Sequence, residues 1–214
     1  MFTAEDWQDP ATRRPGTDHR PARLRNRRRR VLALLGATCL AAGLVLSANA
    51  GWMQAKAWLA QHLIAGAWAQ TLDGESGVRP WPWADTWPVA KMTTPKGDDL
   101  YVLEGLTGHA LAFGPGFMSA SHMAGEPGTM VIAGHKDSHF RFLEELRTGD
   151  FIGVQTQDSS QWRYRVTGFH IADSREQRIV IDHQHDKLML VTCYPFGASH
   201  YDSPWRYVVT AERV

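Results

Sequence analysis

The hydrophobic and polar positions divide the chain into three stretches of different character. Val31–Ser47 contains no charged residue in 17 positions, and the uncharged run continues to Met53. Next, Trp52–Leu72 repeats apolar residues at spacings of three and four and contains no proline, which is typical of an amphipathic helix. From Pro88 onward the apolar runs are short and are interrupted by glycine, proline and aspartate, which predicts β-strands.

Most of the third stretch is predicted to be extended. Met130–Ala133 and Leu188–Val191 are apolar throughout, as expected for strands that are buried on both faces. Phe140–Arg147 alone has a clear helical spacing of its apolar residues. Many short strands with one short helix favour a mainly β fold, either a barrel or a sandwich. The predicted strands are Lys91–Thr93, Asp99–Leu106, Thr129–Ala133, Phe151–Thr156, Gln161–Ile171, Leu188–Cys193 and Trp205–Ala211.

The uncharged run is long enough to cross a membrane. At 1.5 Å per residue, the 23 residues from Val31 to Met53 span a hydrocarbon core of about 30 Å. The arginine cluster that ends at Arg30 should stay in the cytoplasm, so residues 54–214 are expected outside. The A-x-A pattern Ala48–Ala50 leaves a cleaved signal peptide as an alternative, and the body is exported in either case.

Charge and composition complete the expected organisation of the chain. Residues 1–30 hold nine arginines against four acidic residues and show no apolar period, so they predict a disordered basic tail. Residues 31–53 are the expected anchor, and residues 54–88 form a helix and a Trp/Pro-rich linker. Residues 89–214 form the folded body. Because residues 31–214 carry 14 basic and 18 acidic groups, a nucleic-acid partner is not expected.

Three residues of the body form a plausible set for acyl transfer. Cys193 ends an apolar strand before a loop, His135 follows another apolar strand, and Arg206 begins the last strand. If the last two strands are antiparallel neighbours, Cys193 and Arg206 face each other. A thiolate would attack a carbonyl, the imidazole would move the proton and the guanidinium would stabilise the oxyanion. A buried inert thiol, a core histidine and a surface ion pair remain alternatives for the same three residues.

Other chemistries have less support in the sequence. His135 and His139 lie four apart but lack the glutamate of the H-E-x-x-H zinc motif, and Cys39 lies in the expected membrane span. No P-loop and no G-x-G-x-x-G segment before a helix occurs. We therefore expect no metal and no cofactor.

At this level of detail the chain resembles the sortase family. Pro127–Val154 (PGTMVIAGHKDSHFRFLEELRTGDFIGV) is similar to the histidine block of the family, and Leu188–Phe196 (LMLVTCYPF) to its cysteine block. Arg206 follows Cys193 by 13 residues in a final strand, as the arginine of the family does. Gly114–Met118 resembles the segment before the histidine block, so the resemblance covers about residues 95–214.

The variant forms of these motifs refine the resemblance. GHKDSHF and TCYPF are closest to class D sortases, and the stretch PWPWADTWP resembles the sortases of Gram-negative bacteria called class GN. The chain departs from the common pattern at Lys136, where relatives often have arginine, and at Met189, where threonine is usual.

The resemblance implies both a fold and an activity. The expected fold is a closed eight-stranded β-barrel with short helices, preceded by one transmembrane helix and an amphipathic helix. The expected activity is that of a cysteine transpeptidase, which cleaves an LPXTG-like C-terminal sorting signal of an exported protein through a thioester. The acyl group then passes to an amine acceptor of the cell envelope.

The resemblance also assigns roles and a location. Cys193 is the implied nucleophile, His135 the acid and base, Arg206 the oxyanion and substrate binder, and Thr192 a substrate contact. The implied location is the bacterial inner membrane, with the N-terminus inside and the catalytic domain outside, which is the periplasm in a Gram-negative cell. A thiol endopeptidase of the same fold, or a non-enzymatic surface domain, remains an alternative.

Overall fold

The computed structural model describes residues 22–178, 180–198 and 203–214 of the chain. These fall into two compact units, one up to Met53 and one from Gln54 to Val214. Residues 1–21 of the predicted basic tail lie outside the described residues, as do residues 199–202 of the loop between Cys193 and Arg206.

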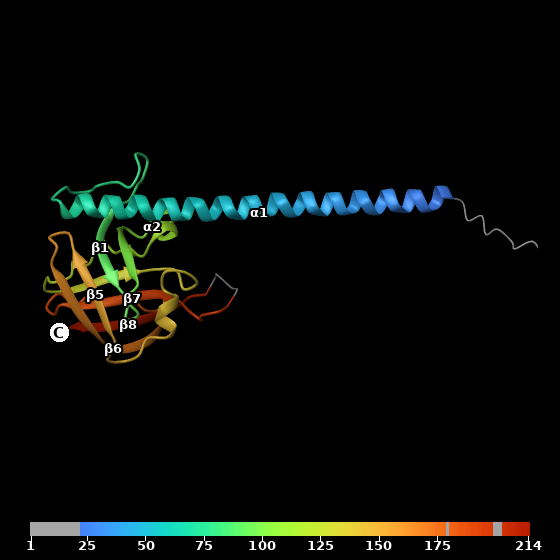
Figure 1. The fold of residues 1–214 in the computed structure, drawn as a ribbon. Coiled ribbons are helices and arrows are strands. Elements are labelled where there is room, and N and C mark those ends of the chain that lie inside the picture. Colours follow the sequence, from blue (N-terminus) through green and yellow to red (C-terminus); the bar gives the residue numbers. More distant parts are fainter. Residues whose placement is uncertain (1–21, 179, 199–202) are drawn as a thin grey trace, which may run out of the picture. The chain divides into compact units, whose positions relative to one another are not determined.

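The first element is one continuous helix, α1 (Ala22–Leu72), of 51 residues (Figure 1). Within it, Asn26–Leu72 is long and apolar enough to cross a membrane. Two expectations are corrected here. Ala22–Arg30 is helical rather than disordered, because arginine is a good helix former and no proline or glycine interrupts the segment. The predicted anchor and the predicted amphipathic helix are also parts of a single helix, since Gly51 alone does not end it.

The part of α1 that belongs to the second unit packs by part of the predicted apolar stripe, whereas Ala57 of that stripe is exposed. Ala60, Ile64 and Trp68 are buried, and Ile64 packs against Leu103 and Ala110 of the body. The amide of Gln61 also donates to the carbonyl of Phe113 at 2.7 Å. The predicted stripe therefore anchors the C-terminal end of α1 to the body.

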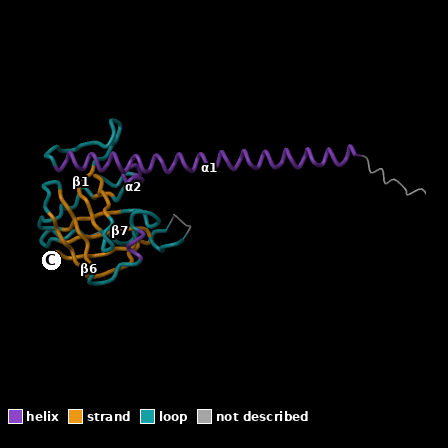
Figure 2. The backbone as a smooth tube through the Cα atoms, viewed as in Figure 1, coloured by secondary structure: helices purple, strands orange, loops and turns teal. Residues whose placement is uncertain are grey.

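Eight strands close into a barrel in the order β1-β2-β3-β4-β7-β8-β6-β5, which confirms the predicted architecture (Figures 1 and 2). The seven strands predicted from the sequence are all present with small changes of their ends. The eighth, β3, was missed because it has only two residues, and the short helix α2 was missed as well. The predicted helix 140–147 is reduced to the single 3₁₀ turn η2. The bounds are β1 (Pro88–Thr93), β2 (Asp99–Glu104), α2 (Gly108–Phe113), β3 (Gly116–Phe117), β4 (Thr129–Ala133), η2 (Arg141–Glu144), β5 (Phe151–Thr156), β6 (Gln161–Asp173), β7 (Lys187–Cys193) and β8 (Trp205–Arg213).

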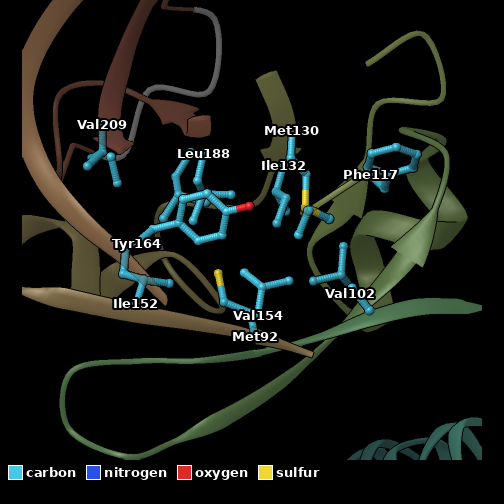
Figure 3. Packing of buried hydrophobic residues seen from close by; sticks show 14 of the residues in the cluster. Met92, Val102, Phe117, Met130, Ile132, Ile152, Val154, Tyr164, Leu188 and Val209 are labelled. Carbon is cyan, nitrogen blue, oxygen red and sulfur yellow. The ribbon is translucent and has the colours of Figure 1, made fainter. Parts of the chain in front are cut away.

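The barrel interior is filled by alternate side chains of the strands (Figure 3). Met130 and Ile132 of β4, and Leu188 and Leu190 of β7, are buried in this core. Tyr164 of β6 is fully buried among them, and its hydroxyl donates to a carboxylate oxygen of Asp186 at 2.6 Å. Burial, followed by this carboxylate, raises the pKa of Tyr164 far above its ordinary value. The tyrosine is therefore a neutral hydrogen-bond donor of the core at every physiological pH.

The intervening side chains of the same strands make a second apolar cluster on the outer face. Val131 of β4, Val191 of β7 and Val208 of β8 form its centre, with Met189 and Ala172 packed against them. Successive side chains of a strand point to opposite faces of the sheet, so β4 and β7 are apolar on both faces. This outer face supports the site described next.

Candidate active site

The ends of three strands meet at one edge of the barrel. β4 and β7 are parallel, with Ala133 opposite Val191, so both strands end at the same edge. β7 and β8 are antiparallel, and Cys193 lies directly opposite Arg206. The predicted facing of Cys193 and Arg206 is therefore confirmed, and His135 follows the end of β4 by two residues.

Two hydrogen bonds hold the segment that carries His135 against β7. The amide of Gly134 donates to the carbonyl of Val191 at 3.1 Å. The hydroxyl of Thr192 donates to the carbonyl of Gly134 at 2.7 Å. A Cβ on Gly134 would approach the ring of Phe140 to 2.8 Å, so glycine permits this close packing.

Thr192 is 2% exposed, on the face of β7 opposite to that of Cys193. Its hydroxyl donates a hydrogen bond within the protein, to the carbonyl of Gly134, the residue before His135. The substrate contact implied by the resemblance stays a prediction, and the contact observed here is a positioning one.

Lys136 makes a third connection between the two segments. Its side chain is 4% exposed, and its ammonium donates to the carbonyls of Pro195 and Ala198, each at 2.8 Å. Lysine is rarely buried without a partner, because its charge loses the solvation of water. Here the two carbonyls offset part of that loss, so the residue after His135 fixes the loop after Cys193.

An aromatic cluster also holds the loop that follows Cys193. Tyr194 stacks on Tyr207 with ring centroids 6.1 Å apart, and Phe196 meets Tyr207 edge-on at 5.2 Å. Burial, and then the neighbouring Tyr194, raise the pKa of Tyr207 above its ordinary value. The chain on both sides of Cys193 is thus held by packing as well as by strand pairing.

Arg206 has a fixed guanidinium. Its Nη1 atom donates to the carbonyls of Ser203 at 2.6 Å and Trp205 at 3.0 Å. These bonds hold the head group at the start of β8, next to the strand position opposite Cys193. A guanidinium has five N–H donors, so the remaining ones can serve a ligand.

His135 is exposed, whereas His139 is partly buried nearby. Burial lowers the pKa of His139, and the neighbouring His135 lowers it further. Both causes favour the neutral form of the His139 imidazole, next to His135.

A groove lies over the outer apolar face and is bordered by Arg206. Its volume is about 630 Å³. Its floor comes from β4, β7, β8 and β6, and one wall comes from the loop that follows β6. The floor residues are Val131, Ala133, Ala172, Met189, Val191 and Val208, and the wall residues are Ser174, Gln177, Arg178 and Val180. Because Met189, Val191 and Cys193 alternate along one face of β7, the floor leads along the strand toward the thiol.

Comparison with known proteins decides the family. The family model described as a sortase domain matches residues 92–214, which is more than half of the chain. The chain belongs to the sortase family. Sortase D of Bacillus subtilis (strain 168) is 31% identical over 117 residues, covering 54% of this chain and 58% of that protein. The chain thus spans less than two thirds of this relative's length.

Solved sortase structures show the same fold. Sortase A from Corynebacterium diphtheriae has a TM-score of 0.54 at 24% identity, covering 62% of this chain and 63% of that chain. A Clostridium perfringens Sortase D5 transpeptidase has a TM-score of 0.53 at 23% identity, covering 69% of this chain and 86% of that chain. The sortase barrel predicted from the motifs is therefore confirmed, together with family membership.

The structure also shows what the sequence did not reveal. Ser174, Gln177, Arg178 and Val180 form a groove wall, but they lie in a loop with no motif, and nothing in its pattern distinguishes it from other loops. Lys136 was noted only as a departure from the family, and its polar neighbours Asp137 and Ser138 gave no sign that its side chain is buried. The alternation of side chains along a strand could have identified Val191 as a floor residue of the groove, because residues two apart, such as Val191 and Cys193, lie on the same face.

Proposed function

We propose that this sortase is a membrane-anchored cysteine transpeptidase that processes exported proteins. Its substrate is a protein with an LPXTG-like sorting signal at the C-terminus, and its acceptor is an amine of the cell envelope. The single observation that carries the proposal is the pairing of Cys193 with Arg206 at the edge of the 630 Å³ groove.

The groove suits an extended peptide with apolar side chains. Its floor is apolar, and it is bordered by polar groups of His170, Arg178 and Arg206. Small-molecule and peptide sites commonly combine an apolar lining with a few placed polar groups. A peptide along β7 would bring its scissile carbonyl to the thiol of Cys193.

The reaction then proceeds in two balanced steps. The thiolate of Cys193 attacks the scissile carbonyl carbon, and a guanidinium donor of Arg206 stabilises the oxyanion. The C–N bond breaks, and the leaving amine takes a proton from the imidazolium of His135. An acceptor amine attacks the resulting thioester, the C–S bond breaks, and the imidazole of His135 takes the proton that the nitrogen releases.

The location follows from the helix α1. The uncharged run Val31–Met53 supports a single membrane span, and the arginines up to Arg30 support an N-terminus in the cytoplasm. The barrel is then outside the inner membrane. Protease added to spheroplasts of cells that make the full chain should remove the barrel and leave the N-terminal tail protected.

A thiol endopeptidase is the second candidate, because water also resolves a thioester. The product assay uses the full chain, a sorting-signal peptide, and an added amino-acid amide or no added amine. The proposal expects an amide product at the expense of the free acid. A free acid alone, at every amine concentration, would instead identify an endopeptidase, and an uncut peptide would remove both functions.

A further inference from the structure

A second groove, here called the α1 groove, lies between the C-terminal part of α1, the loop that follows this helix, and α2. Its volume is about 500 Å³. The helix forms one side with residues at spacings of three and four, namely Lys56, Leu59, Ala60 and Leu63. The loop runs back beside the helix and adds the rings of Trp81 and Trp83 (Figure 1). Within the described part of the chain, the α1 groove shares no lining residue with the 630 Å³ groove, so it is a separate site.

The α1 groove keeps large apolar side chains on the surface. Leu59 is 51% exposed, Leu63 is 39% exposed and Trp83 is 82% exposed. On the neighbouring face of the same helix, Ile64 and Trp68 are buried against the body. The apolar stripe of this helix is therefore wider than the surface that the body covers. An exposed apolar patch that continues into a groove is typical of an interaction site.

The lining of the α1 groove limits what can bind there. Its described lining residues come from two helices and a loop and include no strand residue, so an extended peptide cannot bind by strand addition. Asp85 and His109, which also line the groove, lie 3.3 Å apart through Oδ2 and Nδ1 and pair with each other. The rest of the lining is mostly apolar, and the volume lies within the range of roughly 300–1,000 Å³ for small-ligand sites. Such a lining suits a chain of methylene groups, which needs no hydrogen-bond partners.

The position of the α1 groove along the chain brings lipids within reach. Lys56 follows Met53, the last residue of the uncharged run, by three residues. Three residues reach at most roughly 11 Å, whatever the direction of the chain. The headgroup region of one leaflet is itself roughly 5–8 Å thick. If Val31–Met53 spans the membrane, the α1 groove therefore begins next to the outer leaflet, where tryptophan is enriched.

The same anchor favours a lipid over a second protein copy as the occupant. A body that is tethered to a bilayer meets lipid chains at a high effective concentration, so a weak affinity is sufficient for occupancy. A second copy must first diffuse to the first one in the membrane. Surrounding lipid is therefore the partner that the tether supplies.

We propose that the α1 groove binds an acyl chain of a phospholipid from the outer leaflet. Leu59, Leu63 and Trp83 contact the methylene groups of this chain, and the bound lipid restricts rotation of the body about its anchor. The inference rests on the membrane anchoring in the proposed function, and it adds a lipid site outside the candidate active site.

The test uses lipids that label the residues in contact with their chains. The full chain is reconstituted in vesicles of phosphatidylethanolamine and phosphatidylglycerol that contain a small fraction of phosphatidylglycerol with a photoreactive diazirine in one acyl chain. After illumination, the adducts are mapped by mass spectrometry. We expect adducts within Val31–Met53, as in any membrane span, and a separate group at Leu59, Leu63 or Trp83.

Substitutions in the α1 groove should remove only the second group of adducts. The double variant Leu59→Asn, Leu63→Asn loses the favourable burial of two leucine side chains, so the adduct yield at Trp83 should fall roughly fivefold or more. The yield within the span should not change. Ile171→Asn is the matched control, because Ile171 is an exposed aliphatic residue that does not line the α1 groove. If the double variant fails to fold, Trp83→Ala repeats the test with the adducts at Leu63 as the readout.

The outcomes separate this inference from the proposed function. Span adducts without adducts at the α1 groove would overturn the lipid site and leave the anchor in place. Equal labelling of Trp83 in the double variant and in Ile171→Asn would overturn it as well. A dimer that Leu63→Asn dissociates would identify a second copy as the occupant instead. Failure of the proposed function would look different, because the span would carry no adducts or the wild type would not cut a sorting-signal peptide.

Discussion

The two faces of β7 carry similar apolar residues, but one face packs in the barrel core and the other lines the groove. Leu188 and Leu190 point into the barrel and are buried by the protein's own side chains. Met189 and Val191 point outward and line a groove that leads toward Cys193. The inward residues are covered completely by the fold, whereas of the outward ones Met189 is partly exposed and Val191 is 7% exposed on the floor of the groove. The comparison teaches that one face of a strand can serve stability while the other lines a groove, which binds the substrate in the proposed function.

The largest effect is expected at the end of the outward face. Cys193→Ala should abolish peptide cleavage and transfer, because the nucleophile is lost and Cys39, the other cysteine, lies in the expected membrane span. Cys39→Ala is the matched control and should retain wild-type activity. Product formation is measured by mass spectrometry. Substantial turnover by the Cys193 variant would remove the covalent mechanism.

The next largest effect concerns the partner of Cys193 on β8. Arg206→Lys keeps the charge but loses the planar fork, and should reduce the rate on the order of 10²-fold or more, the size of a lost oxyanion donor. The pH–rate profile should keep its shape, because the substitution leaves Cys193 and His135 in place. His135→Ala should instead erase the limb that reports the imidazole. A nearly wild-type Arg206→Lys with a shifted pH optimum would refute the assigned role.

The two faces can be separated directly by neighbouring truncations. Leu190→Ala removes a core side chain and should lower the free energy of unfolding by about 2–5 kcal/mol. Val191→Ala removes a smaller side chain, which is 7% exposed and packs with Val131 and Val208 under the groove, and should raise KM for the peptide with a smaller loss of stability than Leu190→Ala. Urea unfolding and peptide kinetics of both variants measure these effects. Equal losses of stability, with unchanged KM in Val191→Ala, would mean that the outward face is simply a second core.

Lys136 tests whether the segments on either side of the site are positioned by their mutual contacts. Lys136→Met keeps an apolar stem of similar length but removes the bonds to Pro195 and Ala198. It should reduce kcat about tenfold, which corresponds to ~1.4 kcal/mol, the lower end of what one charged hydrogen bond contributes. Lys136→Arg should recover most of the rate, because a guanidinium can reach two carbonyls. Lys96→Met, at an exposed lysine, controls for the loss of charge. A Lys136→Met enzyme with wild-type kcat would show that the loop needs no such tie.

The smallest effect is a pH dependence of stability at His139. Burial lowers the pKa of His139 in the native protein, so as pH falls through about 6.5 the unfolded chain takes up a proton that the native state resists. Native stability therefore decreases on acidification. His139→Gln should show a smaller decrease in the free energy of unfolding between pH 7.5 and pH 5.5. An equal or larger decrease in the variant would contradict the burial of this imidazole.

The barrel could be predicted to a large extent, and the reason is physical. Its strands are apolar runs separated by breakers, and seven were located from that pattern. The exceptions are short elements set by tertiary contacts. β3 is only Gly116–Phe117, and it exists because Gly116 fits against the carbonyl of Gly105, which a Cβ would approach to 2.3 Å. Two residues are too few to show the alternation of apolar and polar positions that predicts a strand.

The candidate site also has a part that could be predicted from the sequence and a part that depends on tertiary contacts. Cys193, Arg206 and His135 could be singled out because strand ends and family motifs mark them, and their catalytic roles stay predictions. The groove wall and the bonds of Lys136 depend on where loops fold back, which local sequence does not determine. The role of Thr192 illustrates the difference: its place beside Cys193 was evident, but the direction of its hydroxyl toward Gly134 required the structure.

The central claim is that the outward end of β7 forms a covalent acyl-enzyme. The most direct measurement incubates the full chain with a sorting-signal peptide, quenches at low pH, and maps the modified residue by mass spectrometry. We predict a mass increase equal to the acyl part of the peptide, located on Cys193 and lost on treatment with hydroxylamine. An unmodified Cys193 during active turnover, or an adduct on another residue, would contradict the account.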